Sequence, residues 1–252
     1  MRREPGAPGT DYLSDSTFVF GVVVNGQARA YPHNLLWHHE IHNDKIGDRE
    51  FAVTLCPLTG SGLVFEGKHN GKPIRFSTSG RLFKSNLVMF DPSTDTYWSQ
   101  MLRTGIKGPR AGQTLDLMPV VETTWERWKE MYPDSLVTSS DTGYDRPYNS
   151  YPYGEYRTNH ENTFRTGGYE KTYPEKKRVL GLPAQPKKKS LAFPFPEMNK
   201  LEGDRNVIHA DFNGTPIVIY YEAEHRMAIP FRRTVEVNGK QRSLTFVGQK
   251  AK

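Results

Sequence analysis

Residues 17–31 have the sequence TFVFGVVVNGQARAY, and this stretch determines how the rest of the chain is interpreted. Its first part is apolar and β-branched apart from one glycine, which favours a strand, and residues 27–31 predict a return strand. Between them stands Asn25-Gly26, the dipeptide that most strongly favours a two-residue hairpin turn, because both residues accept positive φ. The sequence therefore predicts a β-hairpin here.

Further short strands follow the same pattern. We expect strands at residues 50–55, 62–65 and 87–90, and a second Asn-Gly hairpin at 69–72 with residues 74–76 as its return strand. One helix is predicted after Thr123, where Thr123 and Glu126 form a capping box, and it should end before Pro133. The fold class expected is α+β and predominantly β.

Several short segments late in the chain resemble segments early in the chain in sequence and in order. The pairs are Val19 to Val22 with Val179 to Leu182, Ala30 to Pro32 with Ala192 to Pro194, residues 51–56 with 216–221, and Asn70 to Lys72 with Asn238 to Lys240. Their numbers differ by 160, 162, 165 and 168, so their order is kept with a slow drift. We expect two related β-rich repeats that form one compact body.

Three regions follow from these patterns. Residues 15–100 form a β unit that carries the candidate site, and residues 176–248 form a second, degenerate β unit. Residues 101–175 connect them through the helix and a loop at 143–174, which holds seven of the thirteen tyrosines. We expect this loop to pack by its rings, because so many tyrosines are rarely left fully solvated.

Composition excludes several classes of protein. The chain has 252 residues, of which 36% are hydrophobic and 25% charged, so a packed core is feasible and wholesale disorder is excluded. No apolar run approaches the roughly 18 residues of a membrane-spanning helix. The net charge of +6 comes from late lysines and arginines in Pro-bounded runs, which favours solvated loops over a nucleic-acid partner.

The first ten residues contain two arginines but no apolar segment, so no secretory signal is expected in the chain as it stands. Removal of such a signal at an earlier stage is the open alternative, and the compartment is left unassigned. Oligomeric state is also left open.

Two segments carry candidate chemistry. Residues 37–44, WHHEIHND, hold three of the eight histidines, and residues 54–60, TLCPLTG, place the single cysteine, Cys56, at the end of a strand. A lone cysteine excludes an intramolecular disulfide and a multi-cysteine metal cage. A thiol at a strand end can become reactive where an imidazole or backbone N–H groups face it.

Blocks along nearly the whole chain resemble a bacterial and archaeal family known as domain of unknown function 3179. The blocks that carry the resemblance are Arg29 to Pro32, His39 to Ile41 with Asn43 and Asp44, Cys56 to Leu58 with Gly60, Ser79 and Gly80 with Ser85 to Leu87, Asp91 with Thr94 and Trp98, Trp125 with Trp128, Asp141 to Tyr144, and Lys177 to Gly181.

The resemblance implies thiol chemistry. Relatives commonly have a second cysteine, or selenocysteine, where this chain has Thr59, and such a pair at a strand end is typical of a redox motif. This chain cannot close that bridge, so a monothiol site is expected, with the Thr59 hydroxyl able to donate to a Cys56 thiolate. His39, Glu40, Asn43 and Asp44 match the family pattern, whereas His38 and His42 depart from it.

The first hypothesis is therefore a redox or nucleophilic thiol site, a possible thiol-dependent oxidoreductase. Cys56 is the nucleophile, His39 its proton partner, and Glu40 or Asp44 orients the imidazole. Its reaction partner would be a small-molecule or protein thiol. The residues expected to line the same pocket are Asn43, Ser79, Ser85 and Trp98.

Two alternatives stay open. Cys56 with His39 and His42 or Glu40 could bind copper or zinc, since thiolate and imidazole ligands suit both, and His38 and His42 would share a face if they lay on a helix. Alternatively, the tyrosine-rich loop and the tryptophans could form a non-catalytic binding surface or a structural module.

Overall fold

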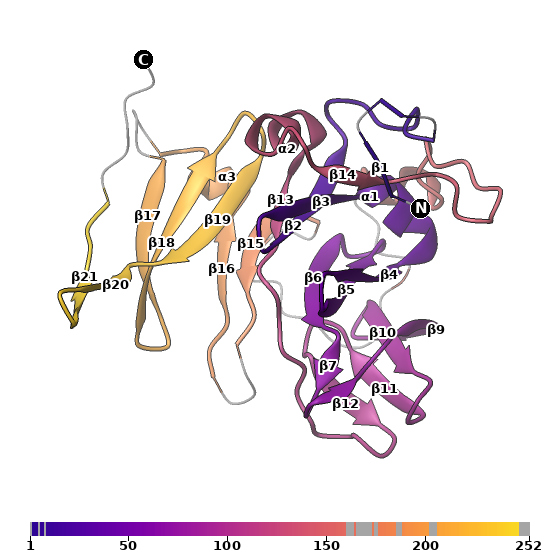
Figure 1. Cartoon of the computed structure of the whole chain (residues 1–252), viewed down its shortest axis with the longest axis horizontal. Helices are drawn as coiled ribbons and strands as arrows, with labels where there is room; N and C mark the ends of the chain where they lie inside the picture. The colour runs from indigo at the N-terminus through magenta and orange to yellow at the C-terminus, as the bar shows by residue number, and fades with distance from the viewer. Residues whose placement is uncertain are drawn as a thin grey trace. The chain divides into compact units, whose positions relative to one another are not determined.

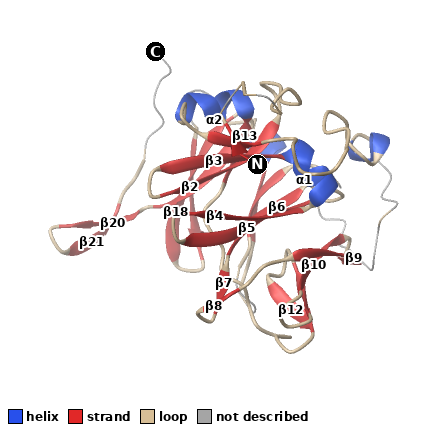
Figure 2. Ribbon diagram, turned by 45° about the vertical axis from the view of Figure 1, so that its right-hand side comes forward, coloured by secondary structure: helices blue, strands red, loops and turns tan. Residues whose placement is uncertain are grey.

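The computed structural model describes residues 2–4, 6–7, 9–159, 164, 173, 176–184, 188–201 and 206–246. Within them, strands greatly outnumber helices (Figures 1 and 2), which confirms the predominantly β, α+β class. The chain divides into two compact units, Met1–Lys176 (unit 1) and Lys177–Lys252 (unit 2). The boundary lies next to residue 176, where the third predicted region begins.

Unit 1 contains the predicted hairpin in a five-stranded sheet. The strands, in spatial order, are β1 (Arg2–Arg3), β14 (Leu136–Thr138), β3 (Gln27–Pro32), β2 (Phe18–Val24) and β13 (Val121–Thr124). Asn25 and Gly26 have φ of 50° and 79°, the backbone of the turn that Asn-Gly favours. The hairpin of residues 17–31 is therefore confirmed.

A short helix, α1 (His33–His39), follows β3, and Pro32 in extended conformation precedes it. The chain then forms a three-stranded antiparallel sheet with β5 in the middle. Its strands are β4 (Ile41–Ile46), β5 (Arg49–Cys56) and β6 (Ser61–Glu66). Because α1 ends at Glu40, His42 lies on a strand, and the condition under which His38 and His42 would share a helical face is not met.

The second Asn-Gly hairpin is shorter than expected. It consists of β7 (Lys68–His69) and β8 (Lys72–Pro73), so the expected return strand at 74–76 is wrong. Ile74 and Phe76 instead bury their side chains in a core cluster, and the Asn43 side chain bonds the backbone of Phe76. Burial of these side chains, and not strand pairing, decides the conformation there.

The remaining elements of unit 1 form a second layer and a helix. The four-stranded sheet contains, in spatial order, β12 (Thr104–Lys107), β11 (Thr96–Ser99), β10 (Asn86–Asp91) and β9 (Ser77–Phe83). The predicted helix is α2 (Trp125–Met131), capped by the Thr124 hydroxyl, one residue later than expected. A 3-10 helix, η1 (Gly154–Arg157), lies in the tyrosine-rich region.

Unit 2 has a hairpin, a helix, a three-stranded sheet and a final hairpin. The elements, in chain order, are β15 (Val179–Leu182), β16 (Leu191–Pro194), α3 (Phe195–Met198), β17 (Val207–Phe212), β18 (Thr215–Glu222), β19 (Met227–Arg232), β20 (Thr234–Val237) and β21 (Lys240–Ser243). The short helices α1 and α3 were not predicted.

Among the residues that the structure describes, three apolar clusters stabilise unit 1 and one stabilises unit 2. The first joins β2 and α1 to the β4–β6 sheet, and the second joins that sheet to β10 and β11 and contains Cys56. The third packs α2 on β2 and β3 through Trp125 and Trp128. In unit 2, Phe195, Met198 and Tyr221 form the cluster. Cys56 therefore lies in the hydrophobic core of unit 1.

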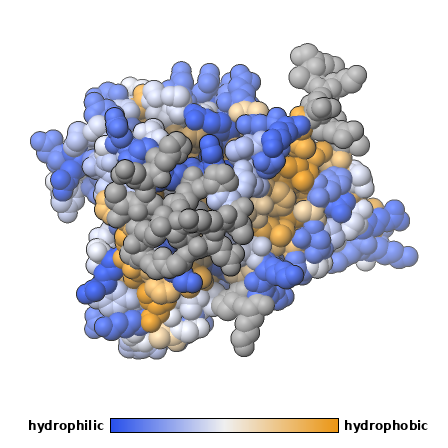
Figure 3. Space-filling model, turned by 180° about the vertical axis from the view of Figure 1, so that it is seen from behind, coloured by the Kyte–Doolittle hydropathy of each residue, from blue (hydrophilic) through white to orange (hydrophobic). Residues whose placement is uncertain are grey.

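The surface carries apolar side chains among polar ones. Leu102 and Phe231 are each 50% exposed, and Figure 3 shows apolar patches between hydrophilic residues. Among the described residues, no helix has the length and apolar character needed to cross a membrane.

Candidate functional site

Cys56 lies where the core meets a surface turn. It is the last residue of β5, pairs with Ser61 of β6, and is 1% exposed. The turn that follows runs outward, since Pro57 is buried, Leu58 half-buried, and Thr59 and Gly60 exposed. The thiol belongs to the second cluster, beside Phe76 and Trp98.

A buried amide network supports the turn from behind. Asn86 Nδ2 donates to Thr59 Oγ1 at 2.9 Å and to Gln100 Oε1 at 3.0 Å, and Gln100 Nε2 donates to Thr54 Oγ1 at 2.8 Å. Gln100 is fully buried. The Thr59 hydroxyl thus accepts from Asn86 and keeps its own proton for donation. Asn86 stood in the family resemblance, but nothing in the sequence pointed to Gln100.

Glu40 occupies a strained position beside the cysteine. It ends α1 with φ of 60° and ψ of −36°, a backbone region that non-glycine residues adopt at a cost of roughly 1–3 kcal/mol. Its carbonyl accepts from Leu55 N–H at 2.8 Å, which holds Glu40 next to the end of β5. Burial raises the pKa of the Glu40 carboxyl above its ordinary value.

Two tyrosines from the last part of unit 1 in the sequence, Tyr151 and Tyr153, lie near the same turn. The Tyr151 hydroxyl donates to the Pro57 carbonyl at 2.9 Å. Burial raises the pKa of Tyr153, and negative charge on Glu40 and on Cys56 raises it further. One phenol therefore lies within electrostatic range of both Glu40 and Cys56. Neither tyrosine was predicted at the site.

His39 has a different partner from the one expected. Its Nε2 lies 2.6 Å from the Tyr148 hydroxyl, which lies 2.6 Å from Thr142 Oγ1. Burial lowers the pKa of His39, and the electrostatic effects of His38 and Arg146 lower it further. Within the part of the chain that the structure describes, no hydrogen bond joins His39 to Cys56.

Asp44 and Asn43 hold strands together. Asp44 Oδ2 accepts from Arg29 Nη1 at 3.0 Å and from the Tyr31 hydroxyl at 2.7 Å, in a largely buried group. Asn43 makes both amide contacts with the backbone of Phe76, at 2.8 and 3.0 Å. These bonds tie β4 to β3 and to the segment before β9, and none of them involves the imidazole that Asp44 was expected to orient.

Of the other predicted residues, Trp98 alone shares the cluster of Cys56, where it is fully buried. Ser79 donates to the Val88 carbonyl at the irregularity between β9 and β10. Ser85, with φ of 64°, forms the turn of the same hairpin. His42 packs its ring against Tyr31, with centroids 5.2 Å apart.

The described residues bring no three His, Cys, Asp or Glu side chains into a group that could hold a metal ion. His39 lies on α1, His42 on β4 and Cys56 at the end of β5, with His39 and His42 each packed against a tyrosine. The expected copper or zinc ligation therefore has no support in this geometry.

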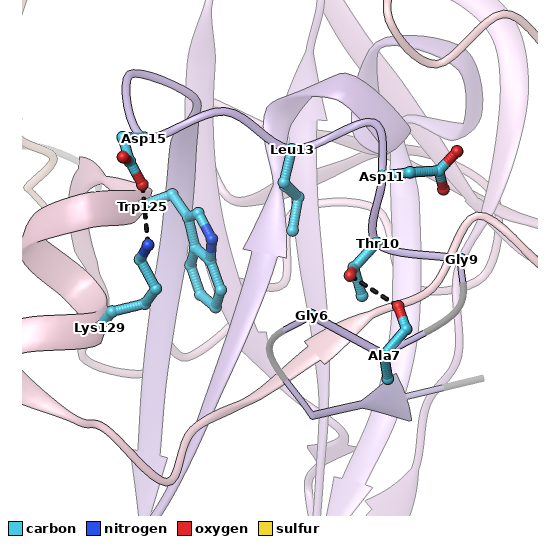
Figure 4. Close-up of a pocket in the computed structure, with 9 residues that line it drawn as sticks. All are labelled: Gly6, Ala7, Gly9, Thr10, Asp11, Leu13, Asp15, Trp125 and Lys129. Atoms are coloured by element: carbon cyan, nitrogen blue, oxygen red, sulfur yellow. Dashed lines mark hydrogen bonds and ion pairs between the residues drawn. The ribbon is translucent and has the colours of Figure 1, made fainter.

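Two cavities lie away from Cys56. A cavity of about 680 Å³ is lined by residues of the segment 6–15 with Trp125 and Lys129 (Figure 4). Lys129 Nζ lies 2.7 Å from Asp15 Oδ1 and 5.6 Å from the centre of a Trp125 ring, so its charge is neutralised by a carboxylate. A smaller cavity of about 220 Å³ is lined in part by Asn43 and Asp44.

Comparison with known proteins gives one match. A family model described as a protein of unknown function (DUF3179) matches residues 5–250. No curated protein matches, and no solved structure matches.

Proposed function

The chain belongs to the DUF3179 family of proteins of unknown function, and we propose that its site is a monothiol centre with Cys56 as nucleophile and Glu40 as proton partner. The observation that carries this proposal is the hydrogen bond from Leu55 N–H to the Glu40 carbonyl at 2.8 Å, which holds Glu40 next to the end of β5, where Cys56 lies. Burial raises the pKa of Tyr153, and charge on Glu40 and on Cys56 raises it further, so both groups lie within electrostatic range of one phenol.

The environment of Glu40 suits a base. Burial raises its pKa, and a carboxylate of higher pKa takes a proton from a thiol more readily. A strained backbone at a partly buried acid is typical of functional positions. His39, bonded to Tyr148, is replaced in this proposal by Glu40 as the group that takes the proton.

The reaction class is thiol–disulfide exchange with a small-molecule or protein disulfide. Glu40 takes the proton from Cys56 Sγ, and the thiolate forms a bond to one sulfur of the disulfide. The other sulfur leaves as a thiolate and receives the proton, so the products are a mixed disulfide on Cys56 and one free thiol. The Thr59 hydroxyl, placed by Asn86, donates to the thiolate.

We expect iodoacetamide to label Cys56 in the folded protein, and Glu40→Gln to slow that labelling roughly tenfold or more, because the amide cannot accept the thiol proton. Rates at pH 7 followed by intact mass measure the effect, with Cys56→Ser as blank. Glu126→Gln, at an exposed position of α2, is the matched control and should leave the rate unchanged. Labelling that occurs only after unfolding contradicts the proposal.

Glu40→Gly separates strain from chemistry. Glycine adopts positive φ without a Cβ penalty, so we expect the variant to gain about 1 kcal/mol in free energy of unfolding and to lose fast labelling of Cys56. Asp95→Gly, at φ of 51° in an exposed turn, should gain similar stability and keep the labelling rate. Urea unfolding gives the stability. A slower-labelling Asp95→Gly would assign the effect to flexibility and not to the carboxylate.

We also propose that the two units are copies of one plan. In the first hairpins, Val19 pairs with Pro32 as Val179 pairs with Pro194, and Gly21 with Ala30 as Gly181 with Ala192. In both units a short helix preceded by proline follows, then a three-stranded sheet, then an Asn-Gly hairpin.

The strand pairing within the two three-stranded sheets is the strongest support for the proposed duplication. Ile41 pairs with Thr54 and Val207 with Tyr220, so both members shift by 166. Cys56 pairs with Ser61 and Glu222 with Met227, which is the same shift. The strand bounds of β4–β6 and β17–β19 differ by this number throughout. The counterpart of Cys56 is therefore Glu222, one residue beyond the Tyr221 that the sequence echo indicated.

The copies differ at the site. Glu40 corresponds to Asn206, since Leu55 N–H donates to the Glu40 carbonyl at 2.8 Å and Tyr221 N–H donates to the Asn206 carbonyl at 2.7 Å. Thr59 corresponds to His225, whose Nε2 lies 3.5 Å from Glu222 Oε1. The second copy thus has a carboxylate and an imidazole where the first has a thiol and a hydroxyl, so the proposed thiol chemistry belongs to unit 1.

A further inference from the structure

Residues 144–157, here called the strap, lie against α1 and the Cys56 turn. Figure 1 shows this part of the chain as salmon loops beside α1. Three side chains of α1 bond it: Asn34 Nδ2 donates to the Tyr148 carbonyl at 2.8 Å, His38 Nε2 lies 3.2 Å from the Ser150 carbonyl, and His39 Nε2 lies 2.6 Å from the Tyr148 hydroxyl. Two of these three contacts use an imidazole.

The far end of the strap is fixed by stacking. The Arg157 guanidinium lies 4.3 Å from the centre of a Trp37 ring and 4.5 Å from that of Tyr151, and the two rings meet edge to face at 5.4 Å. Tyr151 then bonds the Pro57 carbonyl, directly after Cys56. The same segment that bonds the histidines of α1 therefore covers the cysteine turn.

We propose that the strap is an acid-released cover of the Cys56 turn, in which a positive charge on the His39 ring, packed against Tyr144 and Tyr148, destabilises the closed form and opens the turn to solvent. This inference rests on the proposed thiol function for its biological meaning, but the opening itself is independent of thiol chemistry.

The chemistry of the contact sets the direction. With its proton on Nδ1, neutral His39 accepts the hydrogen bond of the Tyr148 hydroxyl, which in turn accepts from Thr142. A protonated ring donates from both nitrogens, so the Tyr148 hydroxyl must turn its own proton to Thr142, and a charge then lies on a partly buried ring packed against Tyr144 and Tyr148. The charged or ionisable groups that face His39 are His38 on its own helix, and Arg146, Tyr144 and Tyr148 from the strap.

The pH window follows from these neighbours. Burial, followed by the electrostatic effects of His38 and Arg146, lowers the pKa of His39 in the closed form, whereas the open form takes a proton near the ordinary value of about 6.5. The closed form is therefore fully favoured above about pH 6.5. Below that value, opening gains up to about tenfold for each pH unit until the closed form is also protonated.

Hydrogen exchange of the amides in residues 148–157, corrected for intrinsic rates, tests the opening at pH 7.5 and pH 5. We expect protection in the wild-type protein to fall about tenfold or more at pH 5. His39→Gln keeps an acceptor for Tyr148 but cannot titrate, so its protection should be independent of pH. His209→Gln, at an exposed position of β17, is the control and should behave as wild type. Equal wild-type protection at both pH values overturns the proposal.

A second readout separates this proposal from the thiol function. 4,4′-Dithiodipyridine reacts with thiols at both pH values, and Tyr148→Phe, which lacks the hydroxyl, should open the strap at pH 7.5. Loss of protection and faster reaction of Cys56 in Tyr148→Phe, together with an unchanged rate in Glu40→Gln, would contradict the thiol function and still support the strap as a cover. Reaction of Cys56 at one rate in wild type, His39→Gln and Tyr148→Phe shows that the strap does not cover it.

Discussion

Gly21→Ala is expected to lower the free energy of unfolding of unit 1 by about 3 kcal/mol, at the upper end of the range for overpacked cores. A Cβ at Gly21 would lie 2.0 Å from Cζ3 of Trp128. The indole cannot retreat, because Trp128 is fully buried and its Nε1 donates to Ser135 Oγ at 2.7 Å. The added methyl therefore forces α2 away from β2.

Gly181 provides the matched control. It holds the same place in the hairpin of unit 2, yet nothing lies within 4 Å of a Cβ built there. Gly181→Ala should therefore be neutral or stabilising by up to about 1 kcal/mol, since alanine loses less backbone entropy in a strand. Urea unfolding followed by circular dichroism and tryptophan fluorescence measures both variants. Similar losses in the two would show that backbone conformation, and not the Trp128 contact, requires the glycine.

Gly62→Ala is expected to cost a similar amount, about 3 kcal/mol, and Phe20→Leu is expected to restore most of it. A Cβ at Gly62 would lie 1.9 Å from Cζ of Phe20, a buried ring in the first cluster. In the proposed alignment of the copies, unit 2 has Leu180 and Ala228 at these two positions, and both pack against its cluster. The sizes thus compensate: unit 1 combines the large Phe20 with Gly62, and unit 2 combines the smaller Leu180 with the larger Ala228.

The double-mutant cycle is the measurement. Phe20→Leu alone should destabilise by roughly 1 kcal/mol through the cavity it leaves, and the double variant should be more stable than Gly62→Ala alone. A coupling of 1 kcal/mol or more, of compensating sign, is the expected result. Additive losses would mean that the pair in unit 2 is not the counterpart of the pair in unit 1, and would count against the proposed duplication.

The local sequence was sufficient to predict the turns of the hairpins. Asn25-Gly26, Asn70-Gly71 and Asn238-Gly239 all have positive φ at both residues, because this dipeptide accepts that backbone almost independently of its surroundings. The capped helix α2 was predicted for the same reason, since its threonine cap lies next to the bonds it satisfies. The short helices α1 and α3, of seven and four residues, lack the length at which a helical period becomes visible.

The site depended on contacts between distant parts of the chain. The sequence singled out Cys56, Glu40 and Thr59. Cys56 and Thr59 lie at the end of β5 and in the turn that follows, and Glu40, which ends α1, accepts a hydrogen bond from Leu55 N–H. The sequence prediction assigned the proton partner to His39 because this histidine matches the family pattern and a thiol site needs a base, whereas Tyr148, 109 positions away, bonds that ring. It likewise assigned Asp44 to the site, although Arg29 and Tyr31 occupy its carboxylate.

What the sequence determined by itself was the β-rich class, the Asn-Gly turns, and a single thiol that no second cysteine can bridge, because each of these depends on neighbouring residues or on composition. The tertiary structure alone decided what surrounds that thiol. Gln100, Tyr151 and Tyr153 reach the turn from 44 to 97 positions away in the chain. Loop closure over such lengths leaves no local pattern, since burial and side-chain hydrogen bonds formed only in the folded chain select these partners.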